Sequence, residues 1–310
     1  MSIRVIAFIA LFQILFFSPL SGSNICTDTI NVNKDTTVNK TLLRDVTIGA
    51  ATLYAGSMIG LYSLWYSDYP QSSFHFINDN NEWLQLDKAG HITSSYYLGV
   101  IGYESLVLAG VEQNKATWIG GSFGLFYLTA VETLDGFSAG WGASGGDLLA
   151  NFTGTACFIS QQLLWKEQRI RFKWSVHTTK YAAYRPDLLG SNFPQRILKD
   201  YNGHTYWLSG NIRDLLKEDS RFPAWINVAV GYSGTGMVGA CSNPAVYEDI
   251  SLPTFDRYRR YFLSPDIDLT KIKVNNKTAS YIFKVLGFIK LPMPAIEFNH
   301  KGIQFHALYF

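Results

Sequence analysis

Apolar and polar positions divide the chain into two halves of different texture. In the first half, residues 46–66 form an apolar stretch without a single charged side chain. Three further stretches, 87–108, 116–134 and 146–165, are apolar over helical lengths and carry their charges near the ends. This pattern predicts a compact bundle of about four apolar helices, and we expect the fold to be mainly α.

The first stretch has two readings. It is long enough to cross a bilayer, for which about 20 residues suffice, and its Gly, Ala and Ser content suits close helix packing. A buried helix inside a compact bundle explains the same residues. The next two stretches are closed off by Glu104, Lys115 and Glu132, so they are short for spanning. We therefore expect a membrane-associated bundle, either half sunk in the bilayer or held together by contacts among its helices.

After Trp165 the helical period is lost. Short apolar segments at 225–231, 258–268, 281–291 and 302–310 are separated by Pro and Gly, and a helical turn is expected at 211–217. The pattern predicts a strand-containing, irregular C-terminal half over residues 166–310. Pro292 and Pro294 fit poorly in a regular strand, and whether the strands form an open or a closed sheet is not fixed by the pattern.

The first residues have the features of a secretory signal. Arg4 precedes the apolar run 5–17, and the small residues of 21–23 offer a cleavage site before Asn24. We expect 1–23 to be a signal peptide, 24–41 a polar lead-in and 42–165 the helical domain. Lipidation at Cys26 is the alternative, but the residues before it match a lipoprotein signal poorly.

Composition supports an exported protein near a membrane. Charged residues make up 16% and aromatic residues 15% of the 310 positions, a balance shifted toward membrane contact. The formal charge of +2 and the lack of a basic block argue against a nucleic-acid partner. Cys26, Cys157 and Cys241 are too far apart for a metal motif. A Cys26–Cys241 bridge is one reading, and Cys157 is most simply a small core residue.

Polar side chains at helical spacing mark a candidate site. Asp87 and His91 are four residues apart, so both lie on one helix face. A carboxylate bonded to one ring nitrogen would orient the histidine as a base or nucleophile. The plainer readings are an N-cap for Asp87 and a satisfied interior histidine for His91. Lys88 is either a phosphate-binding group or a surface lysine.

The other two polar clusters follow at the next helix ends. Glu132 and Asp135 lie three residues apart, so if both are buried, one should hold a proton or share a cation. A solvated helix end is the alternative. The glycine-rich segment 140–146 leads into Asp147, a candidate cap, and Asn151 lies one turn further on. Asn151 would otherwise form a helix-to-helix hydrogen bond.

Together these clusters resemble a known pattern. The order Asp87-Lys88-His91, then Glu132-Asp135-Gly136, then Ser144-Asp147-Asn151-Gly154 is similar to VanZ-like membrane domains and, more closely, to the YfiM-type family of predicted periplasmic lipoproteins. The resemblance covers roughly residues 42–165, and segments 206–209 and 229–237 also look like longer YfiM-type members. VanZ-like proteins tend to have Gln where this chain has Asp135, and their arginine in the following loop is missing.

The resemblance implies a helical domain at a membrane, among proteins thought to act on lipid head groups or lipid-linked phosphates. His91 would be base or nucleophile, Asp87 its orienter, Glu132 or Asp135 a proton donor or cation ligand, and Asp147 with Asn151 would position the head group. Lys88 and Ser144 would bind substrate. Because the site is mostly acidic, a phosphate would need Lys88, a helix N-terminus or a divalent cation to offset the charge.

Two other functions explain the same residues. In the first, the chain is a non-catalytic envelope protein whose polar pairs lock the helices together and whose strand-rich half contacts an outer-membrane protein partner. In the second, His91 and at least two carboxylates form a structural metal site. The catalytic hypothesis requires the six polar side chains to converge on an accessible pocket, whereas the non-catalytic one expects them to be used in separate contacts between helices.

Overall fold

The computed structural model describes residues 38–66, 70–216, 220–275, 279, 282–284 and 286–310. The predicted signal peptide, Cys26 and most of the polar lead-in lie outside these residues. Cys157 is half-buried and Cys241 is exposed.

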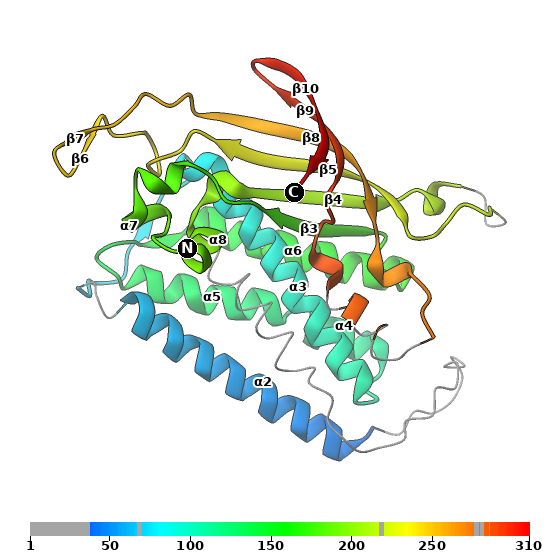
Figure 1. Cartoon of the computed structure of the whole chain (residues 1–310). Coiled ribbons are helices and arrows are strands. Elements are labelled where there is room, and N and C mark those ends of the chain that lie inside the picture. The colour runs from blue at the N-terminus through cyan, green and yellow to red at the C-terminus, as the bar shows by residue number, and fades with distance from the viewer. Residues whose placement is uncertain (1–37, 67–69, 217–219, 276–278, 280–281, 285) are drawn as a thin grey trace.

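The N-terminal half is a layer of packed helices (Figure 1). Its elements are α2 (Lys40–Leu61) with a π-helical turn (Tyr62–Tyr66), α3 (Leu86–Leu108), α4 (Gln113–Gly121), α5 (Phe123–Gly136) and α6 (Gly145–Trp165). Helix α3 is central and contacts α4, α5 and α6. The predicted bundle is confirmed with one correction, because the expected helix over 116–134 is two helices that meet at Ser122.

Glycines explain both this break and the tight packing around it. Gly120 and Gly121 end α4 and weaken the helix at that point. A Cβ atom on Gly120 would lie only 2.4 Å from the carbonyl carbon of Gly102 in α3. The backbones of α3 and α4 therefore touch directly, which a larger side chain at either position would prevent.

Helix α2 lies on the side of the helical layer away from the sheet (Figure 1). It contacts α5 through an edge-to-face pair of Tyr54 and Tyr127, with ring centroids 5.7 Å apart. Among the described residues, no helix combines the length and apolarity needed to cross a membrane. The spanning interpretation of 46–66 is therefore wrong, since Gly, Ser, Thr and Tyr dilute its apolar residues. The buried-helix interpretation is also wrong, because Ser57 is the only described α2 side chain that is buried.

The C-terminal half is built on one six-stranded antiparallel sheet, in the order β10-β9-β8-β5-β4-β3. Its strands are β3 (Ile170–Val176), β4 (His204–Asn211), β5 (Ile226–Thr235), β8 (Tyr258–Ile267), β9 (Met293–Asn299) and β10 (Gly302–Tyr309). Short helices α7 (Pro186–Leu189) and α8 (Phe193–Lys199) join β3 to β4. Two small strand pairs complete the structure: β1 (Phe76–Ile77) with β2 (Ala143–Ser144), and β6 (Val246–Tyr247) with β7 (Ile250–Ser251). The fold as a whole is mixed α/β, more strand-rich and more regular than the predicted mainly α chain.

Three of the four predicted strands are confirmed as β5, β8 and β10, and a short helical turn lies at Arg213–Leu215 as expected. The strand predicted over 281–291 is wrong, because the described residues there include the 3-10 turn Leu286–Phe288. Pro294 lies within β9 after all. A register shift between His306 and Tyr309 of β10 leaves this proline outside the paired positions, so its missing N–H costs no ladder bond.

The two faces of the sheet have opposite character. On one face, an aromatic cluster of Trp207, Phe262 and Tyr309 surrounds buried charges, including the Lys173 ammonium 2.7 Å from an Asp266 carboxylate oxygen. The other face carries a register-matched line of side chains across all six strands, which we call the apolar sheet row: Phe172, Leu208, Val230, Leu263, Ile296 and Phe305. At β3 this row packs on the Tyr96 ring of α3, with centroids 5.1 Å apart. Toward β10 it is exposed, and Phe305 is 71% accessible.

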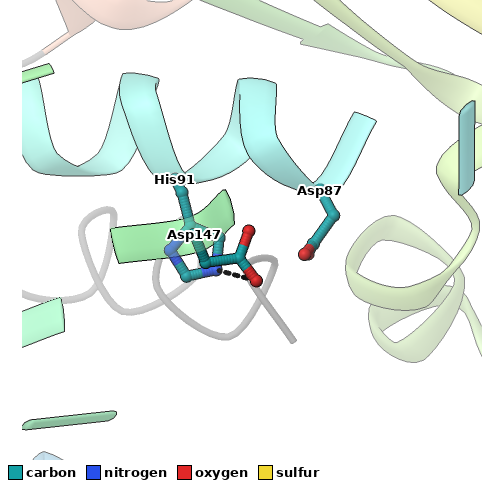
Figure 2. A group of neighbouring side chains, drawn as sticks. All are labelled: Asp87, His91 and Asp147. Atoms are coloured by element: carbon teal, nitrogen blue, oxygen red, sulfur yellow. Dashed lines mark ion pairs between the residues drawn. The ribbon is translucent and has the colours of Figure 1, made fainter. Parts of the chain in front are cut away.

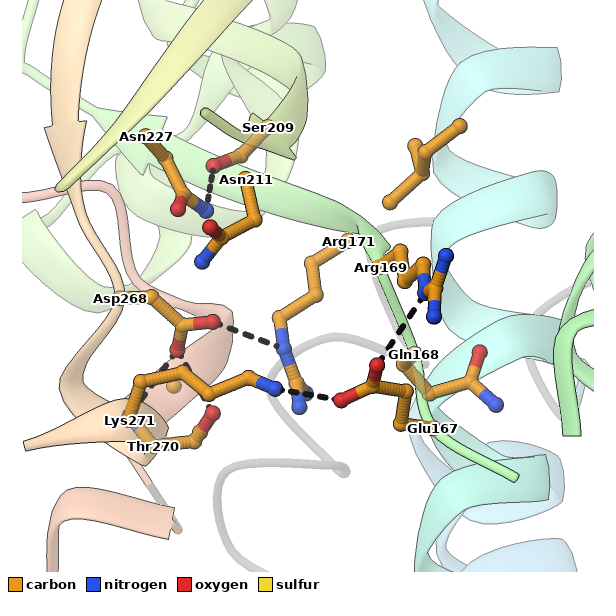
Figure 3. Close-up of polar contacts among 12 residues, drawn as sticks. Glu167, Gln168, Arg169, Arg171, Ser209, Asn211, Asn227, Asp268, Thr270 and Lys271 are labelled. Atoms are coloured by element: carbon orange, nitrogen blue, oxygen red, sulfur yellow. Dashed lines mark hydrogen bonds and ion pairs between the residues drawn. The ribbon is translucent and has the colours of Figure 1, made fainter. Parts of the chain in front are cut away.

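A polar junction fastens the sheet to the end of α6. The Gln161 amide bonds both the N–H and the C=O of Ile170, at 2.8 and 2.9 Å. Arg171 of β3 donates to Asp268 at 3.1 Å, and Lys271 pairs with Glu167 at 2.7 Å, as Figure 3 shows. The helical layer and the sheet are thus joined by hydrogen bonds as well as by apolar contact.

Candidate functional site

The site begins where α3 and α6 touch. A Cβ atom on Gly154 would lie 2.1 Å from the backbone oxygen of Ile92, so only glycine permits this approach. One turn earlier on α6, the Asn151 carboxamide oxygen lies 2.8 Å from Nδ1 of His91. Ser95 of α3 also donates to the Asn151 carbonyl at 2.7 Å. Since Nδ1 donates its proton to Asn151, the lone pair of His91 is on Nε2.

Two carboxyl groups face that lone pair. Nε2 lies 3.7 Å from Oε1 of Glu132, which α5 supplies. It lies 3.9 Å from Oδ2 of Asp147, in the first turn of α6, and Figure 2 draws this second pair. The second Glu132 oxygen accepts the backbone N–H of Ser144 at 3.0 Å. Each of the three facing residues is only 1% exposed. Side chains from three helices, predicted from separate sequence clusters, therefore meet at one place.

Ser144 and Lys88 organise the rim of this cluster. The Ser144 hydroxyl caps α6 by accepting the N–H of Asp147 at 3.1 Å, and it donates to Asp79 at 2.6 Å. The Lys88 ammonium lies 2.5 Å from Asp79, 3.1 Å from Asp147 and 3.7 Å from Asp87. Lys88 is therefore not a snorkelling surface lysine but the cation that partly neutralises the cluster.

Asp87 and Asp135 lie at the edge of the cluster. Asp87 does not orient His91 by a hydrogen bond, since Asn151 has that contact. Instead, Asp87 accepts the hydroxyl of Tyr201 at 2.6 Å, while its side chain still points to the same side of α3 as His91 (Figure 2). Asp135, fully buried, accepts the hydroxyl of Tyr66 at 2.6 Å.

Sequence reasoning missed four contributors: Asp79, Tyr201, Tyr66 and Ser95. Asp79 belongs to the Asn-Asp-Asn-Asn segment 78–81, which has no helical period and resembles an ordinary loop tip. Tyr201 comes from the other half of the chain, beyond α8. The sequence signal that could have revealed Asp79 is an acidic residue in a short polar loop shortly before the Asp-Lys-x-x-His segment.

Burial raises the pKa values of acidic side chains in the cluster. Burial raises the pKa of the Glu132 carboxyl from 4.5 to about 8, with His91 opposing the shift and Asp147 adding to it. Burial and the Asp87 carboxylate raise the pKa of Asp147 as well, against the effect of Lys88. Near neutral pH the folded site therefore holds protons that the unfolded chain would release.

The raised pKa values predict how the stability of the fold depends on pH. A carboxyl with a raised folded pKa stabilises the fold fully below its unfolded pKa, and that stabilisation disappears as the pH rises through the folded pKa. With EDTA present, we expect the Tm to fall between pH 4.5 and pH 8, the interval set by Glu132. Glu132→Gln, which mimics the protonated acid, should flatten this slope in a thermal melting series. Parallel pH profiles for the variant and the wild type would contradict the assignment.

Gly154→Ala tests the helix approach that builds the site. The added methyl group must push α6 away from the Ile92 carbonyl, and overpacking of this kind costs about 1–3 kcal/mol. The better helix propensity of Ala returns about 1 kcal/mol at most. We therefore expect a net loss of stability in denaturant unfolding. Gly56→Ala is the matched control, because nothing lies within 4 Å of its new Cβ, and it should be neutral or slightly stabilising. Equal effects of the two substitutions would contradict the close approach.

Comparison with known proteins finds no family model that matches the chain, no curated protein similar to it and no similar solved structure. The resemblance to VanZ-like and YfiM-type proteins therefore stays a prediction based on the motif residues.

Proposed function

We propose that this chain is an exported, periplasm-facing envelope enzyme that acts on lipid head groups or lipid-linked phosphates, by hydrolysis or head-group exchange. One observation carries the proposal. Nε2 of His91 and Oε1 of Glu132 face each other at 3.7 Å, both buried and both without a hydrogen-bond partner among the described residues. Buried polar atoms are normally satisfied, so such a pair indicates a place built for reaction or binding.

Each polar side chain has a role in this proposal. The Nε2 lone pair of His91 accepts a proton or another electrophile, while Asn151 fixes the ring. Glu132, whose raised pKa keeps a proton near neutral pH, serves as the acid for a leaving group. Lys88 attracts the phosphate. Asp87, Asp135 and Ser144 act as positioning residues through their neighbours.

Exposed apolar side chains support work at a membrane. Leu149, Phe152 and Leu164 of α6 are 57–73% accessible, and the apolar sheet row is exposed toward β10. In the sheet row the exposed side chains are neighbours in register, and contiguous apolar surface of this kind marks contacts with lipid or with other proteins. In this proposal they hold the protein against the bilayer from which the substrate comes.

The proposal is tested with the purified full chain and defined lipid vesicles. Vesicles containing phosphatidylethanolamine, phosphatidylglycerol and a polyprenyl diphosphate are incubated with the protein, and the lipids are followed by mass spectrometry. We expect one head group or phosphate to be released or exchanged. If every lipid remains unchanged across pH and divalent-cation conditions, the enzymatic proposal fails.

The near-complete burial of the cluster favours a second candidate function. Here the protein is a non-catalytic envelope component, and contacts such as His91–Asn151 and Ser95–Asn151 hold α3 to α6. The apolar sheet row would then contact an outer-membrane protein partner. This candidate predicts no lipid turnover by the wild type and a lowered Tm for Asn151→Ala, since an unpaired buried polar group costs about 1–3 kcal/mol.

A further inference from the structure

The unsatisfied atoms at the centre of the cluster share one chemical property. Nε2 of His91 bears a lone pair because Nδ1 donates to Asn151. Carboxyl oxygens of Glu132 and Asp147 lie 3.7 and 3.9 Å from Nε2. These distances are too long for hydrogen bonds. The centre is thus lined by nitrogen and oxygen atoms of the kind that bind metals, and Nε2 has no hydrogen-bond partner among the described residues.

The spacing of these atoms suits a metal ion. One ligand atom each from Asp87, His91 and Asp147 lies within 4.8 Å of the other two, and all three residues are buried (Figure 2). A cation with bonds of about 2.1–2.5 Å has neighbouring ligands about 3–4 Å apart. Only a small closing movement is needed to bring these atoms to that spacing.

The charge balance points the same way. Four acidic side chains, Asp79, Asp87, Glu132 and Asp147, surround this space, and Lys88 is the cation that pairs with three of them. An isolated buried carboxylate is costly unless it is paired, protonated or metal-bound. A divalent ion displaces protons from the groups that bind it, so it would offset the negative charge of the ionised ligands and would also remove the repulsion of a phosphate.

We infer that Asp87, His91 and Asp147 form a binding site for one divalent transition-metal ion of the Mn²⁺ or Zn²⁺ type. One imidazole nitrogen among carboxylate oxygens suits these ions, whereas Ca²⁺ takes six to eight oxygen ligands. Asn151 is the outer partner that fixes the tautomer, as in most metal-bound histidines. The inference rests on the proposed function for the role of the ion in turnover: with the ion bound, Nε2 of His91 would be a ligand, and the ion would supply the attacking water in place of the imidazole acting as base.

Binding of Mn²⁺ to the EDTA-stripped full chain tests the site without any turnover. Calorimetric titration should give one ion per chain, and pulsed electron paramagnetic resonance of bound Mn²⁺ should show coupling to an imidazole nitrogen. His91→Gln should weaken binding more than tenfold and remove the nitrogen coupling. His300→Gln is the matched control, since His300 lies 3.1 Å from Asp256 in an exposed His–Asp pair and should leave both readouts unchanged.

The wild-type readouts do not depend on whether a variant folds. Absence of stoichiometric binding, or bound Mn²⁺ without nitrogen coupling, overturns the inference, as does unaltered affinity in a folded His91→Gln. The proposed function is judged separately. Ion binding without any change in the lipids contradicts only the enzymatic proposal, while lipid turnover that survives complete chelation contradicts only the role of the ion in turnover.

Discussion

His91→Gln is expected to abolish most lipid turnover. The imidazole supplies the only lone pair that faces both Glu132 and Asp147 among the described residues of the cluster. Loss of a positioned acid–base group typically lowers kcat by about 10²–10⁴-fold. Glutamine keeps an amide that can still bond Asn151, so the contact between α3 and α6 is retained as far as a substitution allows. Initial rates on the vesicle assay measure the effect.

The matched control is again His300→Gln, because His300 lies in the turn between β9 and β10 and its side chain is exposed. Its rate should equal that of the wild type. Near-UV circular dichroism and the melting temperature establish that the His91 variant is folded. A folded His91→Gln protein that retains its rate within twofold would rule out His91 as a catalytic residue.

Asp266→Ala is expected to cause the largest loss of stability. Asp266 lies 2.7 Å from the Lys173 ammonium, which is fully buried, and it also accepts the Ser209 hydroxyl at 2.6 Å. Removing the carboxylate leaves two buried ammonium groups uncompensated, that of Lys173 and that of Lys290, which lies 3.8 Å from the other Asp266 oxygen. Breaking a buried pair in this way typically costs about 3–5 kcal/mol. Denaturant unfolding followed by circular dichroism measures the change.

A double variant distinguishes the stability lost with the ion pair from the cost of leaving a buried charge unpaired. Lys173→Met together with Asp266→Ala removes the closer pair and leaves only Lys290 without its carboxylate, so the double variant should be less destabilised than Asp266→Ala alone. Lys301→Met removes the exposed pair with Asp256 and should have no measurable effect. If the double variant is as unstable as the sum of its single variants, the buried pair does not explain the loss.

The sequence predicts that the polar side chains of the site meet at one place. It does not predict which of them form hydrogen bonds with one another. Spacing of four residues places Asp87 with His91, and Asp147 with Asn151, on single helix faces, and apolar surroundings favour their meeting. Which group bonds His91 depends on how closely α6 approaches α3, and this is set by Gly154 against the Ile92 carbonyl. Such an approach cannot be read from one helix alone, so Asn151 was not predicted as the orienting group.

The missed strands have equally specific causes. Five of the first six residues of β4 are buried, so both faces of the strand are covered and no alternation of apolar and polar residues marks it. Pro294 argues against a strand at β9, because proline cannot donate a ladder hydrogen bond. The bulge in β10 leaves Pro294 unpaired with that strand, and the sequence does not reveal this bulge. β5 and β8 were predictable because their buried and exposed positions largely alternate.

Anomalous diffraction from crystals of the full chain soaked with Mn²⁺ tests the central claim most directly. We expect one strong peak about 2.1–2.3 Å from Nε2 of His91 and within bonding distance of carboxylate oxygens of Asp87 and Asp147. A Mn²⁺ peak only at surface carboxylates, with the His91 ring directed elsewhere, would contradict a shared centre built by α3, α5 and α6.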